Sequence, residues 1–173
     1  MTRPQLEHII RASAATADVR DIVVIGSQSI LGSHPDAPAD LTVSMEADVF
    51  PKDRPDRSIL IDGAIGELSL FHQTFGYHAH GVDETTAVLP DGWRDRLVKV
   101  DSPGTMGAVG WCLDPHDLAV SKLAAGRGKD LAFVRTMLHA GLVIADVLRA
   151  RLDTTPALHR ERRDLAEALL RSP

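Results

Sequence analysis

The sequence predicts an α/β protein in which a mixed-sheet core is followed by a C-terminal helical extension. Three observations predict this fold class. A continuous apolar run over residues 22–25 ends at a glycine, as expected of a buried central strand. Residues 44–49 alternate polar and apolar, which is the period of a half-buried strand. Beyond residue 113 the chain carries only helical patterns.

The length and composition indicate one globular domain. The chain has 173 residues, of which 44% are hydrophobic and 25% charged. We expect residues 1–113 to form the α/β core and residues 114–173 to pack on it as part of a single compact unit. Cys112 is the lone cysteine, which excludes an internal disulfide and a cysteine-based zinc site. No segment resembles a signal peptide or reaches membrane-spanning length, so we expect a cytoplasmic protein without membrane partners.

The first half of the chain alternates helices and strands. Apolar residues at helical spacing indicate a first helix, and glycines and prolines mark the breaks that follow. The predicted elements are a helix over 3–17, the buried strand over 22–25, a short turn or helix over 26–31, a loop over 32–40, an acidic strand over 41–50, a loop over 51–55, and a helix within 56–75 that is interrupted near Gly63 and Gly66.

The second half begins with strands and ends with helices. We predict strands over 77–82, 96–100 and 108–113, with a turn at Pro90-Asp91-Gly92. Asp114 can cap the next helix through its side chain, and Pro115 suits the first helical position. The predicted helices cover 115–125, ending at Gly126, then 130–139, 144–152, and the stretch from Pro156 to the C-terminus.

Two acids on one strand are the first candidate site. In Glu46-x-Asp48 both carboxylates point to the same face, whereas Ala47 and Val49 point to the other. Paired carboxylates repel one another unless solvent or a cation offsets the repulsion. They are the ligands that Mg²⁺ prefers, although a solvated edge strand would carry the same pattern.

Two further features could bind phosphate. Gly26-Ser27 follows the buried strand, and glycine lets an anion approach the backbone amides, although such a pair is also an ordinary turn. Lys122 has Leu118, Ala119 and Ala125 as helical neighbours, so its ammonium lies beside an apolar face and needs either an anion or a path to solvent.

The turn after Gly126 is basic and ends in a carboxylate. Arg127 and Lys129 could contact phosphates, and Asp130 is placed to cap the next helix. Charge is unevenly distributed: residues 1–120 hold 9 basic and 18 acidic side chains, and residues 121–173 hold 10 and 6. The basic tail mildly favours an RNA partner. Its arginines include Arg149, Arg151, Arg160, Arg162 and Arg163.

Taken in order, these pieces resemble the nucleotidyltransferase superfamily. The pieces are Val24-Ile25-Gly26-Ser27, Glu46-Ala47-Asp48, and the segment DLAVSKLAAGRGKD over 117–130. The last resembles the AbiEii-like and MenT-type branch, whose members are often toxins of toxin–antitoxin pairs. The resemblance covers residues 22–138. It implies that Glu46 and Asp48 bind Mg²⁺ or Mn²⁺, that Gly26, Ser27 and Lys122 hold the triphosphate, and that Asp130 supports the site.

The resemblance implies transfer of a nucleoside monophosphate from an NTP such as ATP to an acceptor hydroxyl. The acceptor is RNA or tRNA, a protein or a small molecule, and a cognate antitoxin is a possible partner. The first acid is Glu rather than the commoner Asp, and the superfamily's third carboxylate has three candidates, Glu67, Asp83 and Asp101. One alternative is a catalytically silent nucleotide- or partner-binding protein of the same fold. Another is a zinc hydrolase using His72, His78 and His80.

Overall fold

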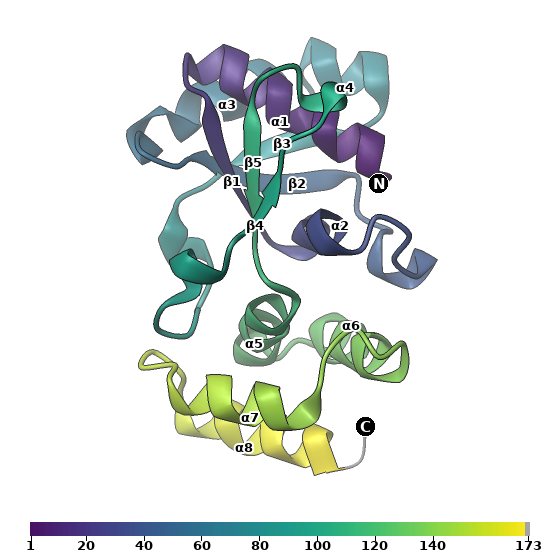
Figure 1. The fold of residues 1–173 in the computed structure, drawn as a ribbon, viewed down its shortest axis with the longest axis vertical. Coiled ribbons are helices and arrows are strands. Elements are labelled where there is room, and N and C mark those ends of the chain that lie inside the picture. Colours follow the sequence, from purple (N-terminus) through teal and green to yellow (C-terminus); the bar gives the residue numbers. More distant parts are fainter. Residues whose placement is uncertain (172–173) are drawn as a thin grey trace.

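The computed structural model describes residues 1–171, and these contain eight α-helices and a five-stranded sheet. Figure 1 shows the sheet between α1 and α3 at one end of the molecule and α7 and α8 at the other. The strands are β1 (Asp21–Ile25), β2 (Glu46–Pro51), β3 (His78–Gly81), β4 (Val98–Val100) and β5 (Val109–Cys112). The helices are α1 (Arg3–Ala17), α2 (Ile30–Ser33), α3 (Ser58–Ile65), α4 (Leu70–Phe75), α5 (Pro115–Ala125), α6 (Gly128–His139), α7 (Ala145–Asp153) and α8 (Arg160–Arg171).

The sheet is mixed, with the order β3-β2-β1-β5-β4. The apolar strand β1 lies at its centre, parallel to β5 and antiparallel to β2, and β2 runs parallel to β3. Burial on both sides explains why four successive residues of β1 are apolar. The predicted fold class, a mixed α/β sheet followed by helices, is confirmed.

The two faces of the sheet have different neighbours. A Cβ added at Gly110 of β5 would meet Ile10 of α1, and one added at Gly32 of α2 would meet Cys112 of β5. Residues 110 and 112 share a strand face, so α1 and α2 cover the same side of the sheet. By the registers of the strands, Ala47 and Val49 of β2 face this side. The acids of β2 therefore lie on the opposite side.

The acidic strand is shorter than predicted. We expected a strand over 41–50, but β2 begins at Glu46. The last β1 partner, Ile25, lies opposite Asp48, and the first β3 partner, His78, lies opposite Glu46, so the paired residues of β2 begin at Glu46. They form a 3-10 turn ending at Leu41 and a bend in which the Ser44 hydroxyl accepts a hydrogen bond from the Glu46 amide at 3.1 Å.

Two helix boundaries also differ from the prediction. The predicted helix within 56–75 breaks at Gly66 and not at Gly63, which lies inside α3. A Cβ at Gly66 would lie 2.1 Å from the carbonyl oxygen of Asp62, so the tight helix end needs glycine. The helix predicted from 130 begins at Gly128, because Arg127 adopts the extended backbone of an N-cap residue. The last helix ends at Arg171, and its predicted continuation over 172–173 lies outside the described residues.

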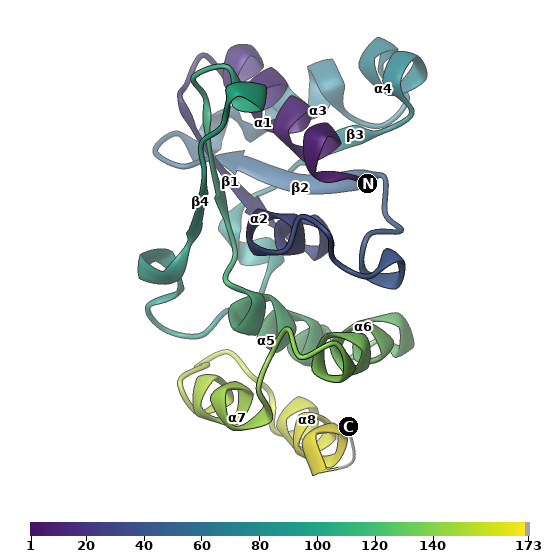
Figure 2. The ribbon, with the colours of Figure 1, turned by 45° about the vertical axis from the view of Figure 1, so that its right-hand side comes forward.

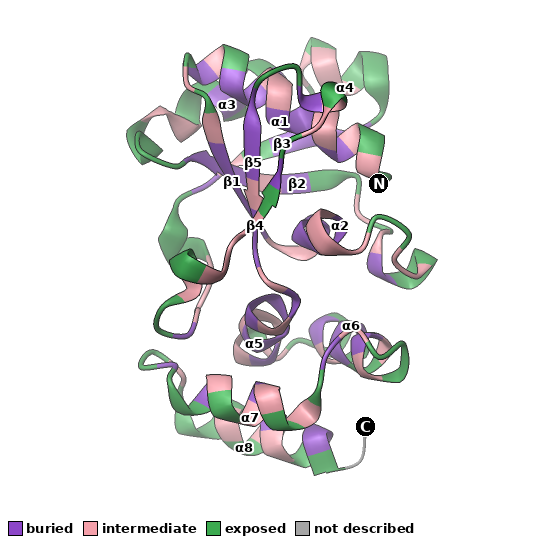
Figure 3. Cartoon of the chain, in the orientation of Figure 1, coloured by how far each residue is buried: buried purple, intermediate pink, exposed green. Residues whose placement is uncertain are grey.

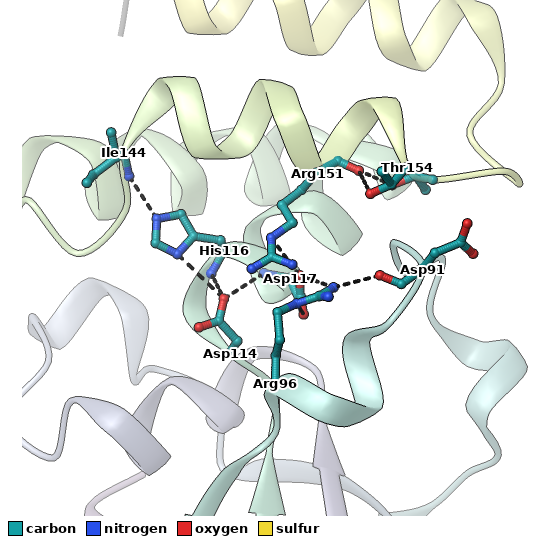
Figure 4. A network of polar contacts seen from close by, with 9 residues as sticks. Asp91, Arg96, Asp114, His116, Asp117, Ile144, Arg151 and Thr154 are labelled. Atoms are coloured by element: carbon teal, nitrogen blue, oxygen red, sulfur yellow. Dashed lines mark hydrogen bonds and ion pairs between the residues drawn. The ribbon is translucent and has the colours of Figure 1, made fainter.

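The C-terminal helices connect to the sheet through a buried acid. Asp114 accepts hydrogen bonds from the amides of His116 and Asp117, as predicted for a helix cap. The Asp117 side chain is fully buried and receives two hydrogen bonds from Arg96, at 2.8 and 3.1 Å. Arg151 of α7 approaches the same carboxylate at 3.6 Å. Figure 4 shows both guanidinium groups pointing at Asp117, so one charge cluster joins the segment before β4 to α5 and α7.

Buried residues concentrate on the central strands and on α5, whereas α7 and α8 are mostly exposed or half-buried (Figure 3). The fully buried side chains include Ile22, Ile25, Leu113, Leu118 and Leu123. Figure 2 shows α5 and α6 lying side by side beneath the sheet. The division into residues 1–113 and 114–173 within one compact unit stays a prediction. Among the described helices, none is long and apolar enough to cross a membrane.

Candidate active site

The acids of β2 face histidines of β3. The parallel register places Glu46 opposite His78 and Asp48 opposite His80. His80 Nδ1 lies 3.0 Å from Asp48 Oδ1, and His78 Nε2 lies 3.3 Å from Glu46 Oε2. One ligand atom from each of Glu46, Asp48 and His80 lies within 4.8 Å of the other two. The pairing of β2 with β3 thus builds a group of two carboxylates and an imidazole.

The zinc alternative named a different set of residues, and its three histidines do not converge. Within residues 1–171, Glu46, Asp48 and His80 are the one group whose geometry could hold a metal ion. His72 stacks on His78 at 4.4 Å, and its Nδ1 accepts a hydrogen bond from the amide of Leu68. The side chain of His78 is only 9% exposed and faces Glu46. A zinc site built from His72, His78 and His80 is therefore wrong for this fold.

Gly26 lies directly against the second acid. Its φ of 71° and ψ of −171° belong to a region that is essentially restricted to glycine. A Cβ at this position would lie 2.2 Å from Asp48 Oδ2. Ser27 follows and starts a 3-10 turn, in which the Ser29 hydroxyl donates to the Gly26 carbonyl at 2.8 Å. The missing side chain of Gly26 thus makes room for the carboxylate of Asp48.

Lys122 projects from α5 into a set of charges. Its side chain is 13% exposed, its Nζ lies 3.4 Å from Asp130 Oδ1, and it lies over the ring of Phe133 at 5.4 Å. Arg127 Nε donates to Asp130 Oδ2 at 2.5 Å. Asp130 is not the N-cap that the sequence suggested. It lies in the first turn of α6, where its buried carboxylate holds Lys122 and Arg127 together.

Burial and charge shift the titration of three of these groups. Burial raises the pKa of Asp48, and the neighbouring Glu46 adds to the rise, while His80 and Lys122 oppose it. Burial lowers the pKa of Lys122, and the charge of Asp130 opposes that change. For Asp130, burial alone would raise the pKa, but the hydrogen bond from Arg127 and the charge of Lys122 hold it below its ordinary value. The site therefore favours an ionised carboxylate at Asp130 beside the partly buried Lys122.

All of these side chains line one cleft of about 700 Å³ between the sheet and helices α5 and α6. The structure brings together the eight residues that the sequence analysis proposed for metal and phosphate binding. They are Gly26, Ser27, Glu46, Asp48, Lys122, Arg127, Lys129 and Asp130. The cleft is lined by carboxylates near β2 and by cations near α5 and α6. The roles of the individual residues stay predictions.

The candidates for a third carboxylate lie elsewhere. Glu67, Asp83 and Asp101 are all absent from the lining of the cleft. Asp83 caps a 3-10 turn through the amide of Thr85, and Asp101 pairs with Lys99 at 2.8 Å. The position opposite Asp48 on the neighbouring strand, where a third ligand would face the acids, is held by His80.

The basic tail is largely engaged within the protein. Arg149 pairs with Asp146, Arg151 with Asp117, and Arg163 with Asp153. Arg162 is exposed and donates to the carbonyl of Gly126 at 3.3 Å, next to the turn that lines the cleft. The positive charge available near the site therefore comes from a few side chains and not from the whole tail.

Sequence reasoning misassigned one residue of the site and missed another. His80 and His78 share one face of the strand predicted over 77–82, which suggests a histidine cluster, and nothing in the sequence shows that β3 pairs in parallel with β2. Phe133 lies one helical turn after Asp130, and its ring forms part of the cleft beside Lys122. The alternation His78-Ala79-His80 was the available signal, and it needed the sheet order to be interpreted.

The donor set fits a divalent cation. Two carboxylates supply the oxygen ligands that Mg²⁺ and Mn²⁺ take in proteins, and the open cleft leaves room for waters and phosphate oxygens. Gly26 leaves a space against Asp48 that a methyl group would fill. The residues present can therefore hold such an ion, with Glu46 and Asp48 as its oxygen ligands.

Comparison with known proteins gives a match to a family model. No curated protein and no solved structure has significant similarity to the chain. A family model described as "Nucleotidyltransferase of unknown function (DUF6036)" matches residues 5–169, which is nearly the whole chain and includes every residue of the candidate site. The chain therefore belongs to the DUF6036 family of nucleotidyltransferases of unknown function.

Proposed function

We propose that the protein transfers a nucleoside monophosphate from an NTP to an acceptor hydroxyl with the help of a divalent metal ion. The observation that carries the proposal is the meeting of Glu46, Asp48 and Lys122 in one cleft of a family described as nucleotidyltransferases. The site has the two kinds of charge that a metal-bound triphosphate requires. Carboxylates lie at one wall and the partly buried ammonium of Lys122 lies at the other.

In the reaction, the acceptor oxygen forms a bond to the α-phosphorus, and the bond from the α-phosphorus to the bridging oxygen breaks. Pyrophosphate leaves, and the hydroxyl proton passes to solvent or a nearby base. A bound Mg²⁺ or Mn²⁺ would neutralise the phosphate oxygens as charge develops there. Lys122 would contact the triphosphate, and Asp130 would hold its ammonium in place. Gly26 and Ser27 would let the phosphates approach the backbone at the end of β1.

The exposed turn between α5 and α6 would supply further contacts to the phosphates. Arg127 and Lys129 are exposed at the turn between α5 and α6 and line the cleft. Their side chains are long enough to reach phosphates without being fixed in the core. Arg127 also pairs with Asp130, the carboxylate that contacts Lys122. A phosphate bound at Arg127 would therefore compete with Asp130 for the guanidinium.

The test uses purified protein, Mg²⁺ or Mn²⁺, each α-labelled NTP, and three acceptor pools: total tRNA, protein extract and small molecules. We expect label in one pool with the wild type and a loss of at least about 100-fold with Glu46→Ala or Asp48→Ala. Glu67→Ala is the matched control, because Glu67 is an exposed acid outside the cleft and its loss should change nothing. Equal labelling by the wild type and both site variants would refute the proposal.

The catalytically silent alternative makes a different prediction. A protein that kept the fold and lost turnover binds NTP in the same cleft but labels none of the three pools. Calorimetric binding of NTP in the presence of metal, measured beside the transfer assay, separates the two. The observation that favours activity is that both acids and the lysine are present together.

Membership in the AbiEii-like or MenT-type branch, a toxin role and a cognate antitoxin are finer parts of the same proposal. They rest on the helix segment over 117–130 and on its place in the cleft. A toxin would arrest growth when expressed, and Asp48→Ala would abolish the arrest. Growth arrest that persists in Asp48→Ala would disconnect any toxicity from the site. A cytoplasmic location also stays a prediction.

A further inference from the structure

Position 80 of β3 differs from the superfamily pattern that the sequence resembles. The resemblance implies a third carboxylate, and on the strand beside the two acids the residue opposite Asp48 is His80. None of the three acids considered for the role lines the cleft. His80 lines it, and its ring nitrogen lies with Glu46 and Asp48 in the group whose ligand atoms are within 4.8 Å of one another.

We propose that His80 is a third protein ligand of the metal ion held by Glu46 and Asp48, and that its imidazole nitrogen shifts the preference of the site from Mg²⁺ towards Mn²⁺. This inference rests on the proposed function, because it concerns the ion that the nucleotide would share. It adds a ligand and a metal preference that the two carboxylates alone do not specify.

The distances are close to those that an ion needs. An octahedral ion at about 2.1 Å from its ligands sets neighbouring ligand atoms about 3 Å apart and opposite ones about 4.2 Å apart. The atoms of Glu46, Asp48 and His80 lie within 4.8 Å of one another, so a small rotation of their side chains would bring them into range. Glu46 is exposed and has freedom for such a rotation.

The surroundings of His80 suit a ligand better than a core residue. Its side chain is 50% exposed, and Nδ1 makes its hydrogen bond to Asp48, a proposed ligand of the same ion. On a bound ion, one ring nitrogen would coordinate and the other would keep its proton for solvent. His78 differs, because its side chain is 9% exposed and orients the carboxylate of Glu46. We assign His78 to positioning and His80 to ligation.

The nitrogen ligand sets the metal preference. Mg²⁺ is bound almost entirely through oxygen, with several waters retained. First-row transition ions accept imidazole, and Mn²⁺ among them also suits carboxylate and water ligands. A site with two carboxylates and one imidazole therefore binds Mn²⁺ more tightly, relative to Mg²⁺, than a site with three carboxylates does.

The direct test is pulsed electron paramagnetic resonance of the full-length protein with Mn²⁺ and a non-hydrolysable NTP analogue. We expect ¹⁴N modulation from a coordinated imidazole, replaced by ¹⁵N modulation when histidine is labelled. His80→Asn should remove this signal and weaken Mn²⁺ binding by about tenfold or more, measured by loss of the free-ion signal. His159→Asn is the control, since His159 is exposed and outside the cleft. It should leave both readouts unchanged.

A second variant tests the preference without removing a ligand. His80→Asp supplies a carboxylate at the same half-exposed position, so we expect the ratio of Mn²⁺ to Mg²⁺ affinity to fall about tenfold while Mg²⁺ binding is kept. Bound Mn²⁺ with no histidine coupling would overturn the role of His80 and leave the proposed function intact. A protein that binds neither ion with nucleotide would remove the proposed function itself. An unchanged affinity ratio in His80→Asp would refute the preference alone.

Discussion

Gly26→Ala tests whether the backbone beside Asp48 is shaped for the site. At φ 71° and ψ −171°, a residue with a side chain carries a strain of about 1–3 kcal/mol. The new methyl would also lie 2.2 Å from Asp48 Oδ2, where ordinary contacts begin at 3.4 Å. Such overpacking costs about 1–3 kcal/mol more. We expect a total loss of about 2–6 kcal/mol in the free energy of unfolding, or about 4–24 °C in Tm.

The same substitution should disturb metal binding. The overlap can be relieved only if the backbone or the Asp48 carboxylate moves, and the carboxylate is the proposed ligand. We therefore expect weaker Mn²⁺ binding in a variant that is still folded at 20 °C, measured by the free-ion resonance signal beside circular dichroism.

Gly63→Ala is the matched control for Gly26→Ala. Gly63 lies in α3 with nothing within 4 Å of an added Cβ, so this change should stabilise the protein by about 0.5–1 kcal/mol and leave metal binding alone. Opposite signs for two Gly→Ala changes would confirm the geometric argument. A Gly26→Ala protein with the stability and metal affinity of the wild type would refute it.

Three further outcomes are expected. Asp130→Asn removes the charge that opposes the lowering of the Lys122 pKa, so that pKa should fall further, as NMR titration of the lysine would show; no change would contradict the pairing. Arg96→Ala leaves the buried Asp117 carboxylate with Arg151 at 3.6 Å as its remaining cation, and should lower the free energy of unfolding by about 2–4 kcal/mol. Calorimetry should show a single transition, and two separate transitions would contradict one compact unit. Burial raises the pKa of Cys112 to about 12, so the group stays a thiol at pH 8, and an aromatic disulfide reagent should react with it only after unfolding.

The fold could be predicted where the pattern is local. The apolar run of β1 and the helix start at Asp114 carry their own signals, and both lie where the sequence places them. The start of β2 could not be predicted, because a strand ends where its partners end. Residues 41–45 alternate well enough for a strand, but the partners in β1 and β3 reach back only to Asp48 and Glu46, respectively. The N-terminal ammonium donates to the carbonyls of Thr42 and Ser44 in place of a strand ladder.

The acids, the glycine and the lysine of the site could be named from the sequence, because each carries a chemical signature within a few residues. Their convergence in one cleft depends on sheet order and on the position of α5, which no local pattern encodes. The role of Asp130 shows the limit. A carboxylate after a basic turn predicts a helix cap, yet the helix starts two residues earlier and the side chain turns inward to Lys122.

The position of His80 connects fold and chemistry most directly. β3 pairs with β2 in parallel, and the register places residue 80 opposite Asp48. The side chain at position 80 therefore decides which group faces the Asp48 carboxylate. The sequence already showed that residues 78 and 80 share a face with one another. It did not show which strand they face, and a histidine pair without that strand suggests a different metal and a different reaction. Sheet order therefore changes the interpretation of His80 from a member of a histidine cluster to a neighbour of two acids, and the metal preference follows from that change.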